Sequence, residues 1–264
     1  MLLRAIVYLT LAFLLAPIAV IVLFSFHATP SLAFPFTGFS LRWYAELFGN
    51  AQLLAALGRS LLVAFLTAAI TLVLGACASL AWLRLPPRGR ITLELACILP
   101  IALPALFVGV ALLVGFAQVR LALSIPTIVI GHVLLTLPML MVAMRARLAL
   151  FDPSLEEAAR DLGAGVVTTF QRVTLPLVAP TLIASALLGF ALSFDEFVVT
   201  SFVAGNETTL PLFIWSMMRR TITPVINAIS TLALAFSVLL LVAALLIGQM
   251  RRASMLANTL EGEL

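Results

Sequence analysis

Residues 61–83 read LLVAFLTAAITLVLGACASLAWL, an apolar run without a charged side chain. A transmembrane helix needs about 20 such residues, because it must cross a hydrocarbon layer about 30 Å thick. Further long apolar runs complete a set of six predicted spans, at residues 5–26, 61–83, 95–116, 125–144, 177–203 and 231–250. This pattern predicts an all-α integral membrane protein with six transmembrane helices, and we expect residues 1–264 to form a single transmembrane domain.

The composition of the chain excludes most soluble classes of protein. Of its 264 residues 63% are hydrophobic and 10% charged, and 15 basic against 11 acidic residues give a net charge of +4. The charges form short clusters between the apolar runs, so the basic balance does not predict a nucleic-acid partner. All the basic residues are Arg, which excludes lysine Schiff-base chemistry. Cys77 and Cys97 both lie in apolar surroundings and predict no disulfide framework.

The distribution of Arg predicts the orientation in the membrane. Ten Arg residues lie on the side of the two termini, three near the termini and seven in the predicted loops 84–94 and 145–176, and five lie on the other side. The positive-inside rule therefore places both termini in the cytoplasm. We expect residues 206–227 to fold back as a short helix on the outer side. Prolines, each of which removes a helical hydrogen bond, predict kinked or broken helices at Pro17, Pro100, Pro104, Pro126, Pro138 and Pro180.

The predicted cytoplasmic loop does not have the composition of a linker. Its centre reads FDPSLEEAARDLGAGVVTTFQRVTLP, residues 151–176. Asp152 followed by Pro153 is typical of a helix start, with a capping box of Ser154 and Glu157 as the alternative. Gly163 supplies a left-handed stop. We expect a short helix across the cytoplasmic face.

A second helical start follows this stop. The sequence pattern predicts that it lies at Thr168 or Thr169 and leads through Phe170 towards Pro176, which opens the fifth span. The loop would then consist of a helix, a turn and the beginning of another helix.

The order EAA, three residues, Gly, nine residues, Val, one residue and Leu-Pro within this loop resembles the EAA loop of the membrane subunits of bacterial ABC importers. Val173 departs from that pattern, which usually has Ile. The resemblance implies the type I permease fold of these importers and makes the short helix a coupling helix that docks in a groove of a separate ATPase. The residues it assigns to ATPase coupling are Glu157, Ala158, Ala159, Gly163, Leu175 and Pro176.

Two adjacent acids interrupt the fifth apolar span. Asp195 and Glu196 would each cost about 2.5–3.5 kcal/mol at the centre of a bilayer, which predicts that they face a wet cavity, a partner or a counter-charge. On one continuous helix Glu196 shares a face with Ser193 and Thr200, so Glu196 is favoured as the cavity acid. Asp195 would instead meet a neighbouring helix or a sister chain. A structural polar contact is the other interpretation of either acid alone. The predicted substrate pathway comprises Asp195, Glu196, Ser193 and Thr200.

Four longer stretches resemble one branch of the ABC permeases, those of spermidine/putrescine-type importers. They are SFDEFVVTSFVAG (193–205), TLPLFIWSMMR (209–219), TPVINAISTLAL (223–234) and FSLRWYAELF (39–48). The resemblance runs over essentially the whole chain and implies an importer of polyamines or related amines. Several polyamine permeases carry an acid directly after the proline of the third span, whereas Pro104 is followed here by Ala105. A monoamine, aminobutyrate or another amine-bearing solute therefore stays open.

The resemblance also implies partners. These are a second permease chain, forming a heterodimer, an ATPase dimer, a periplasmic or lipid-anchored solute-binding protein, and membrane lipid. It implies no cofactor in this chain, with ATP and Mg bound by the partner ATPase, and the sequence holds no GxxxxGK[ST] that would cradle phosphates.

Other functions have weaker support in the sequence. No HExxH, CxxC pair or GxSxG occurs, so we predict no metal site, no catalytic residue and no enzymatic activity of the chain itself. His132, within the fourth span, is predicted to be a hydrogen-bonded helix contact rather than a ligand. The main rival function is an ATP-independent secondary transporter or channel that uses the two acids as a cation or proton relay.

Overall fold

The computed structural model describes residues 2–30, 36–220, 224–239 and 242. Across these residues the secondary structure is helical, apart from an isolated β-bridge between His27 and Phe39. The described residues divide into two compact units, the first formed from residues 2–30, 36–58, 210–220, 224–239 and 242 and the second from residues 59–209. Each unit is described by itself.

Four helices are long and apolar enough to cross a membrane. They are α1 (Leu2–Ser25), α3 (Ala51–Arg84), α6 (Ile125–Leu148) and the continuous stretch Val166–Asp195, whose main part is α9 (Leu175–Asp195). Two further helices, α4 (Pro87–Ala102) and α5 (Ala105–Gln118), are separated by a sharp bend, and together they count as a fifth span if the pair is taken as one. The predicted all-α membrane class is confirmed. For the sixth span the described part is an apolar helix at Pro224–Leu239, which starts before the predicted residue 231, and most of residues 240–250 lie outside the described residues.

The predicted start of the second span and the predicted loop at residues 84–94 are both wrong. The second span begins at Ala51 instead of residue 61, because Asn50 Oδ1 accepts the N–H groups of Gln52 and Leu53 at 3.0 and 3.1 Å and so starts the helix early. The predicted loop 84–94 is mostly helix, since α4 already begins at Pro87, which is suited to a first helical position.

Two predicted spans are broken. The span at residues 95–116 bends by 107° between α4 and α5, where Pro104 cannot donate a helical hydrogen bond, as the prolines predict. The continuous helix predicted over residues 177–203 is wrong, because α9 ends at Asp195 and a separate α10 (Val198–Val203) follows. Glu196 between them has extended backbone angles, φ −69° and ψ 116°. The stripe of Ser193, Glu196 and Thr200 on one helix face therefore does not exist as such.

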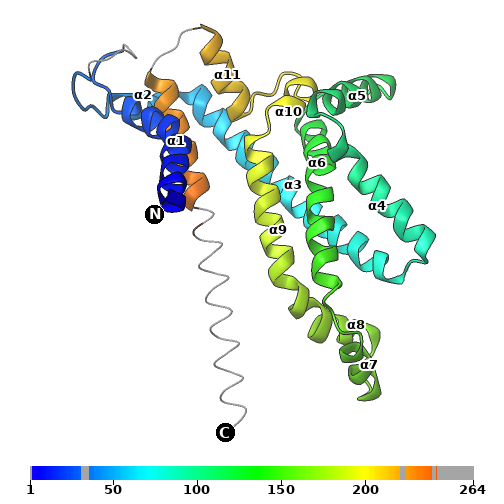
Figure 1. Cartoon of the computed structure of the whole chain (residues 1–264). Helices are drawn as coiled ribbons and strands as arrows, with labels where there is room; N and C mark the ends of the chain where they lie inside the picture. The colour runs from blue at the N-terminus through cyan, green and yellow to red at the C-terminus, as the bar shows by residue number, and fades with distance from the viewer. Residues whose placement is uncertain (1, 31–35, 221–223, 240–241, 243–264) are drawn as a thin grey trace. The chain divides into compact units, whose positions relative to one another are not determined.

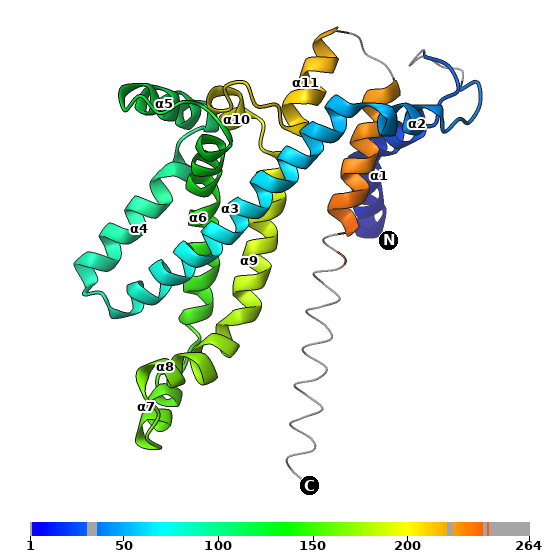
Figure 2. The same cartoon turned by 180° about the vertical axis from the view of Figure 1, so that it is seen from behind.

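The second unit is organised around α6 and α9, which run side by side (Figures 1 and 2). Their shared core consists of Leu140, Met144, Leu148, Val178 and Leu182, with Leu72, Ala76 and Leu83 of α3 packed against it. At one end of this pair lie α5 and α10, and at the other lie α7 (Ser154–Asp161) and α8 (Val166–Thr169). This arrangement places the broken helix ends, between α4 and α5 and between α9 and α10, far from the loop that contains α7.

The first unit holds α1, α2 (Arg42–Gly49) and α11 (Leu210–Arg220). Trp43 Nε1 donates to the carbonyl of His27 at 2.7 Å, and the hydroxyls of Ser25 and Tyr44 are 2.7 Å apart, so α2 is tied to the end of α1. The helix α11 lies inside residues 206–227, where a short helix was predicted.

Candidate functional site

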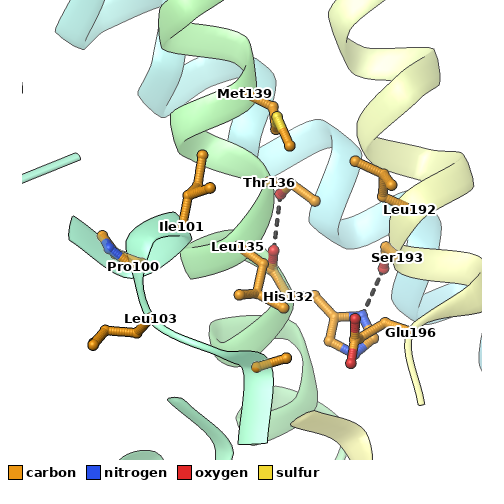
Figure 3. A pocket seen from close by; sticks show the side chains of 11 residues that line it. Pro100, Ile101, Leu103, His132, Leu135, Thr136, Met139, Leu192, Ser193 and Glu196 are labelled. Atoms are coloured by element: carbon orange, nitrogen blue, oxygen red, sulfur yellow. Dashed lines mark hydrogen bonds between the residues drawn. The ribbon is translucent and has the colours of Figure 1, made fainter. Parts of the chain in front are cut away.

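A cavity of about 290 Å³ opens in the second unit, between the α4–α5 break, α6 and the end of α9 (Figure 3). The break contributes Pro100, Ile101, Leu103 and Ala105 to its wall. The remaining wall is formed from two helices, by His132, Leu135, Thr136 and Met139 of α6 and by Leu192, Ser193 and Glu196 at the end of α9. Most of the lining is apolar, and its one carboxylate is that of Glu196.

The break between α9 and α10 is held by His132. Its Nδ1 lies 2.7 Å from Ser193 Oγ on one side of the break, and its Nε2 lies 2.8 Å from Thr200 Oγ1 on the other. All three residues are buried. His132 is thus the hydrogen-bonded helix contact that was predicted. It also lines the cavity, which the sequence does not reveal.

The polar network continues from His132 into α3. Thr136 Oγ1 donates to the His132 carbonyl at 2.9 Å and lies 2.8 Å from Thr71 Oγ1. Buried hydroxyls of this kind satisfy one another's hydrogen bonds, which fixes the helices in register.

Glu196 both accepts hydrogen bonds at the start of α10 and lines the cavity. Its Oε1 accepts the N–H of Val199 at 2.8 Å, and its carbonyl accepts Thr200 Oγ1 at 2.8 Å, so it starts α10. Within the described residues no hydrogen bond reaches Oε2, and the side chain lines the cavity. Such a carboxylate oxygen at a mainly apolar wall suits an ammonium group.

The four predicted pathway residues occupy different positions. Ser193 and Glu196 line the cavity, and Thr200 is buried behind them against His132. Asp195 is exposed at the end of α9 and is not part of the lining. The structure therefore brings Ser193, Glu196 and Thr200 together through the break and sets Asp195 apart. Sequence reasoning missed Thr136, Met139 and the α4–α5 wall, for which the Pro100–Pro104 spacing was the available signal.

The predicted coupling loop forms the short helix α7. Asp152 Oδ1 accepts the N–H of Ser154 at 3.0 Å, and hydrogen bonds from the backbone and side chain of Ser154 lower the pKa of Asp152. Gly163 ends the turn with a φ of +85°, as predicted. The second helical start predicted at Thr168 or Thr169 is wrong, because the helix resumes earlier, at Val166, and runs through η1 (Phe170–Thr174) into α9.

This loop exposes apolar side chains. Leu162 is 90% exposed, Val166 62% and Val167 67%. Glu157 and Ala158 are exposed beside them, and Ala159 is half-buried. Leu175 and Pro176 are exposed at the start of α9, in a different element. Exposed apolar side chains that gather beside a polar helix such as α7 are typical of a protein interaction site.

A family described as "Binding-protein-dependent transport system inner membrane component" matches residues 72–252. This chain belongs to that family. A spermidine/putrescine transport system permease protein, PotC of Haemophilus influenzae, is 34% identical over 245 residues, covering 92% of this chain and 95% of that protein. A putrescine transport system permease protein, PotI of Escherichia coli K12, is 36% identical over 230 residues, covering 84% and 82%.

Solved structures of ABC transporters share the fold of this permease. A bacterial transporter that imports alginate matches with a TM-score of 0.71 at 16% identity, covering 92% of this chain and 93% of that one. The MetNI methionine transporter matches with a TM-score of 0.65 at 15% identity, covering 75% and 95%. The predicted ABC importer permease fold is confirmed, and the family and the apolar helices make this chain a multi-pass protein of the inner membrane.

Proposed function

We propose that this permease is one membrane subunit of an ATP-driven importer of polyamines such as spermidine and putrescine. The observation that carries the proposal is the single carboxylate, Glu196, in an otherwise mainly apolar cavity beside a broken helix. An ammonium group would meet Glu196 Oε2, and the methylene chain would lie along Leu135, Met139 and Leu192. The relatives named as spermidine/putrescine and putrescine permeases support the same solute class.

The cavity favours a cation over a zwitterion. Aminobutyrate would bring a carboxylate that needs a positive partner, and the cavity lining contains no Arg. Its His132 already has both ring nitrogens engaged by hydroxyls. A polyamine brings no carboxylate that the cavity would leave unpaired, and Glu196 pairs with one of its ammonium groups; such differences are how a site discriminates between related solutes.

The partners follow from the loop at the other end of the unit. Glu157, Ala158, Ala159, Gly163, Leu175 and Pro176, with the exposed Leu162, would form the face that docks on a cytoplasmic ATPase, which binds ATP and Mg. An ATPase dimer offers two grooves and one permease chain offers one such loop, so a second permease chain completes the assembly. Asp195, exposed beside the cavity, would contact that sister chain or the solute. A periplasmic or lipid-anchored binding protein would deliver the solute, and both termini would be cytoplasmic.

Uptake of labelled solutes tests the proposal. In cells that express the whole importer, Glu196→Gln should lower putrescine and spermidine uptake by about tenfold, because it removes the charge but keeps the shape. Glu46→Gln, at an exposed acid of α2, serves as the matched control and should leave uptake unchanged. Wild-type uptake that persists after ATP depletion would favour the secondary-transporter alternative. Cation uptake that is unaltered in both Glu196→Gln and Asp195→Asn would remove the acidic pathway.

A further inference from the structure

The helix α7 is joined to the base of α9 by a carboxylate that lies one residue before Glu157. Thr174 Oγ1 donates a short hydrogen bond to Glu156 Oε1, and Arg160 Nη2 donates to Glu156 Oε2 at 3.2 Å. Thr174 is 1% exposed, and it is the last residue of η1. Glu156 is a residue of α7, and its carboxylate is oriented by Arg160 one turn further along the same helix and joined to the transmembrane helix through Thr174.

This bond is the one side-chain hydrogen bond between α7 and the segment 166–195 within the described residues. The turn between α7 and α8 contains Gly163, which is in the left-handed conformation, and Gly165. Neither residue carries a side chain. A movement of α7 can pass along that backbone only weakly, because glycine offers little resistance to a change of dihedral angles. The Glu156–Thr174 hydrogen bond connects α7 to the base of α9 directly, without the glycine-containing turn.

The helix itself is irregular where Thr174 lies. Residues 170–174 form a π-helical turn, in which hydrogen bonds span i→i+5, and such turns often occur at functional positions. Directly after it, Arg147 Nε of α6 donates to the carbonyl of Leu177 at 3.0 Å, and α9 packs on α6. Thr174 thus lies at the junction between the irregular turn and the firmly packed part of α9.

We infer that Glu156, through its hydrogen bond to Thr174, transmits the movement of α7 to α9 during the ATP cycle. The inference rests on the proposed function, because it requires an ATPase docked on α7. Glu156 is a positioning residue in this account, and the docking face that contains Glu157 is separate from it. Without the bond, the ATPase still binds and hydrolyses ATP, but its movement is absorbed in the turn at residues 163–174.

The test uses the complete importer, with its sister permease, ATPase and binding protein, reconstituted in liposomes. ATP hydrolysis and putrescine uptake are measured in the same vesicles and expressed as solute moved per ATP. Thr174→Val removes the hydroxyl at nearly constant shape and should lower this ratio about tenfold, with the ATPase still co-purifying. Thr174→Ser, which keeps the hydroxyl, should leave the ratio close to that of the wild type. Thr168→Val, the same substitution at an exposed position of the same loop, is the control and should leave the ratio unchanged.

Three outcomes overturn the inference alone, given a wild-type importer that transports. They are an unchanged ratio in Thr174→Val, a loss in Thr174→Ser as large as in Thr174→Val, and a loss of the bound ATPase in Thr174→Val, which would indicate a structural role. A wild-type assembly without ATP-dependent uptake would overturn the proposed function itself and this inference with it.

Discussion

His132 Nδ1 lies 2.7 Å from Ser193 Oγ, although the two residues are 61 positions apart in the chain. The opposite ring nitrogen contacts Thr200, so one imidazole joins α6 to both sides of the α9–α10 break. A broken helix leaves backbone groups without helical partners, and a side chain from a neighbouring helix stabilises the broken form. The position of Glu196 at the cavity thus depends on a residue of another helix.

Replacement of His132 by Ala is expected to destabilise this arrangement. The Ser193 hydroxyl would lose its partner, Thr200 would keep only its bond to the Glu196 carbonyl, and a gap would form beside Ser193, at a cost on the order of 2–3 kcal/mol. Thermal unfolding of the purified permease in detergent should show a lower midpoint. Putrescine uptake should fall as well, since Glu196 is no longer fixed. The control for the uptake measurement is His27→Ala in the first unit, which also removes a buried imidazole but should spare the cavity network. An unchanged midpoint in His132→Ala would contradict this account.

Ala105 offers a second prediction, about solute preference. It lines the same cavity as Glu196 and is the first residue of α5, where an acid is favoured by the helix dipole. Ala105→Asp should therefore fold and add a second carboxylate to the cavity. We expect spermidine uptake to rise relative to that of a monoamine, by about threefold or more, given that even an exposed ion pair contributes up to about 1 kcal/mol.

Competition assays with unlabelled amines check this preference. Ala105→Asn, which is polar and of similar size but uncharged, separates the effect of charge from that of volume. A shift of equal size in Ala105→Asn would show that the carboxylate is not responsible.

The spans could be predicted because the hydrocarbon core imposes length and polarity on each of them. The break at Leu103 was also accessible from the sequence, since Pro104 has no N–H group to continue α4. The break at Glu196 was not, because residues 195–197 read DEF and contain neither Pro nor Gly. It depends on His132 and on the capping of Val199 by Glu196, contacts that only the tertiary structure brings together.

The same contrast holds for the loop. The motif located α7, and Gly163 located its end, because both features are local. The hydrogen bond between Glu156 and Thr174 spans 18 positions and follows no capping or spacing rule. It was therefore invisible until the two helices were placed.

A third prediction concerns the junction of α3, α4 and α6. Glu94 Oε1 accepts Trp82 Nε1 at 2.7 Å and lies 3.0 Å from Arg145 Nη2, and the Arg145 guanidinium lies over the Trp82 ring, 5.1 Å from its centroid. Glu94→Ala removes both polar contacts from this junction. Because the Glu94 and Arg145 side chains are 23% and 33% exposed, solvent screens the ion pair, and we expect a loss of only about 1–2 kcal/mol.

Unfolding measurements in detergent at low and high salt separate the contribution of the Glu94–Arg145 ion pair from that of the hydrogen bond to Trp82. The contribution of the ion pair should shrink in salt, whereas that of the Trp82 hydrogen bond should persist. Thr92→Ala in the same helix is the control, since among the described residues its hydroxyl bonds only to the Arg88 carbonyl of α4. A loss in Glu94→Ala that vanishes entirely in high salt would show that the hydrogen bond to Trp82 contributes nothing.

The last prediction concerns the turn that ends α7. Gly163 has a φ of +85°, a conformation that costs a residue with a β-carbon about 1–2 kcal/mol and a β-branched residue more. An added Cβ would meet no neighbouring atom within 4 Å, so any effect of a substitution comes from the backbone and not from a clash. Gly163→Asn should therefore be nearly neutral, because Asn tolerates this region, whereas Gly163→Val should distort the turn and reduce co-purification of the ATPase. Equal co-purification with the Asn and Val variants would show that the shape of this turn does not govern docking.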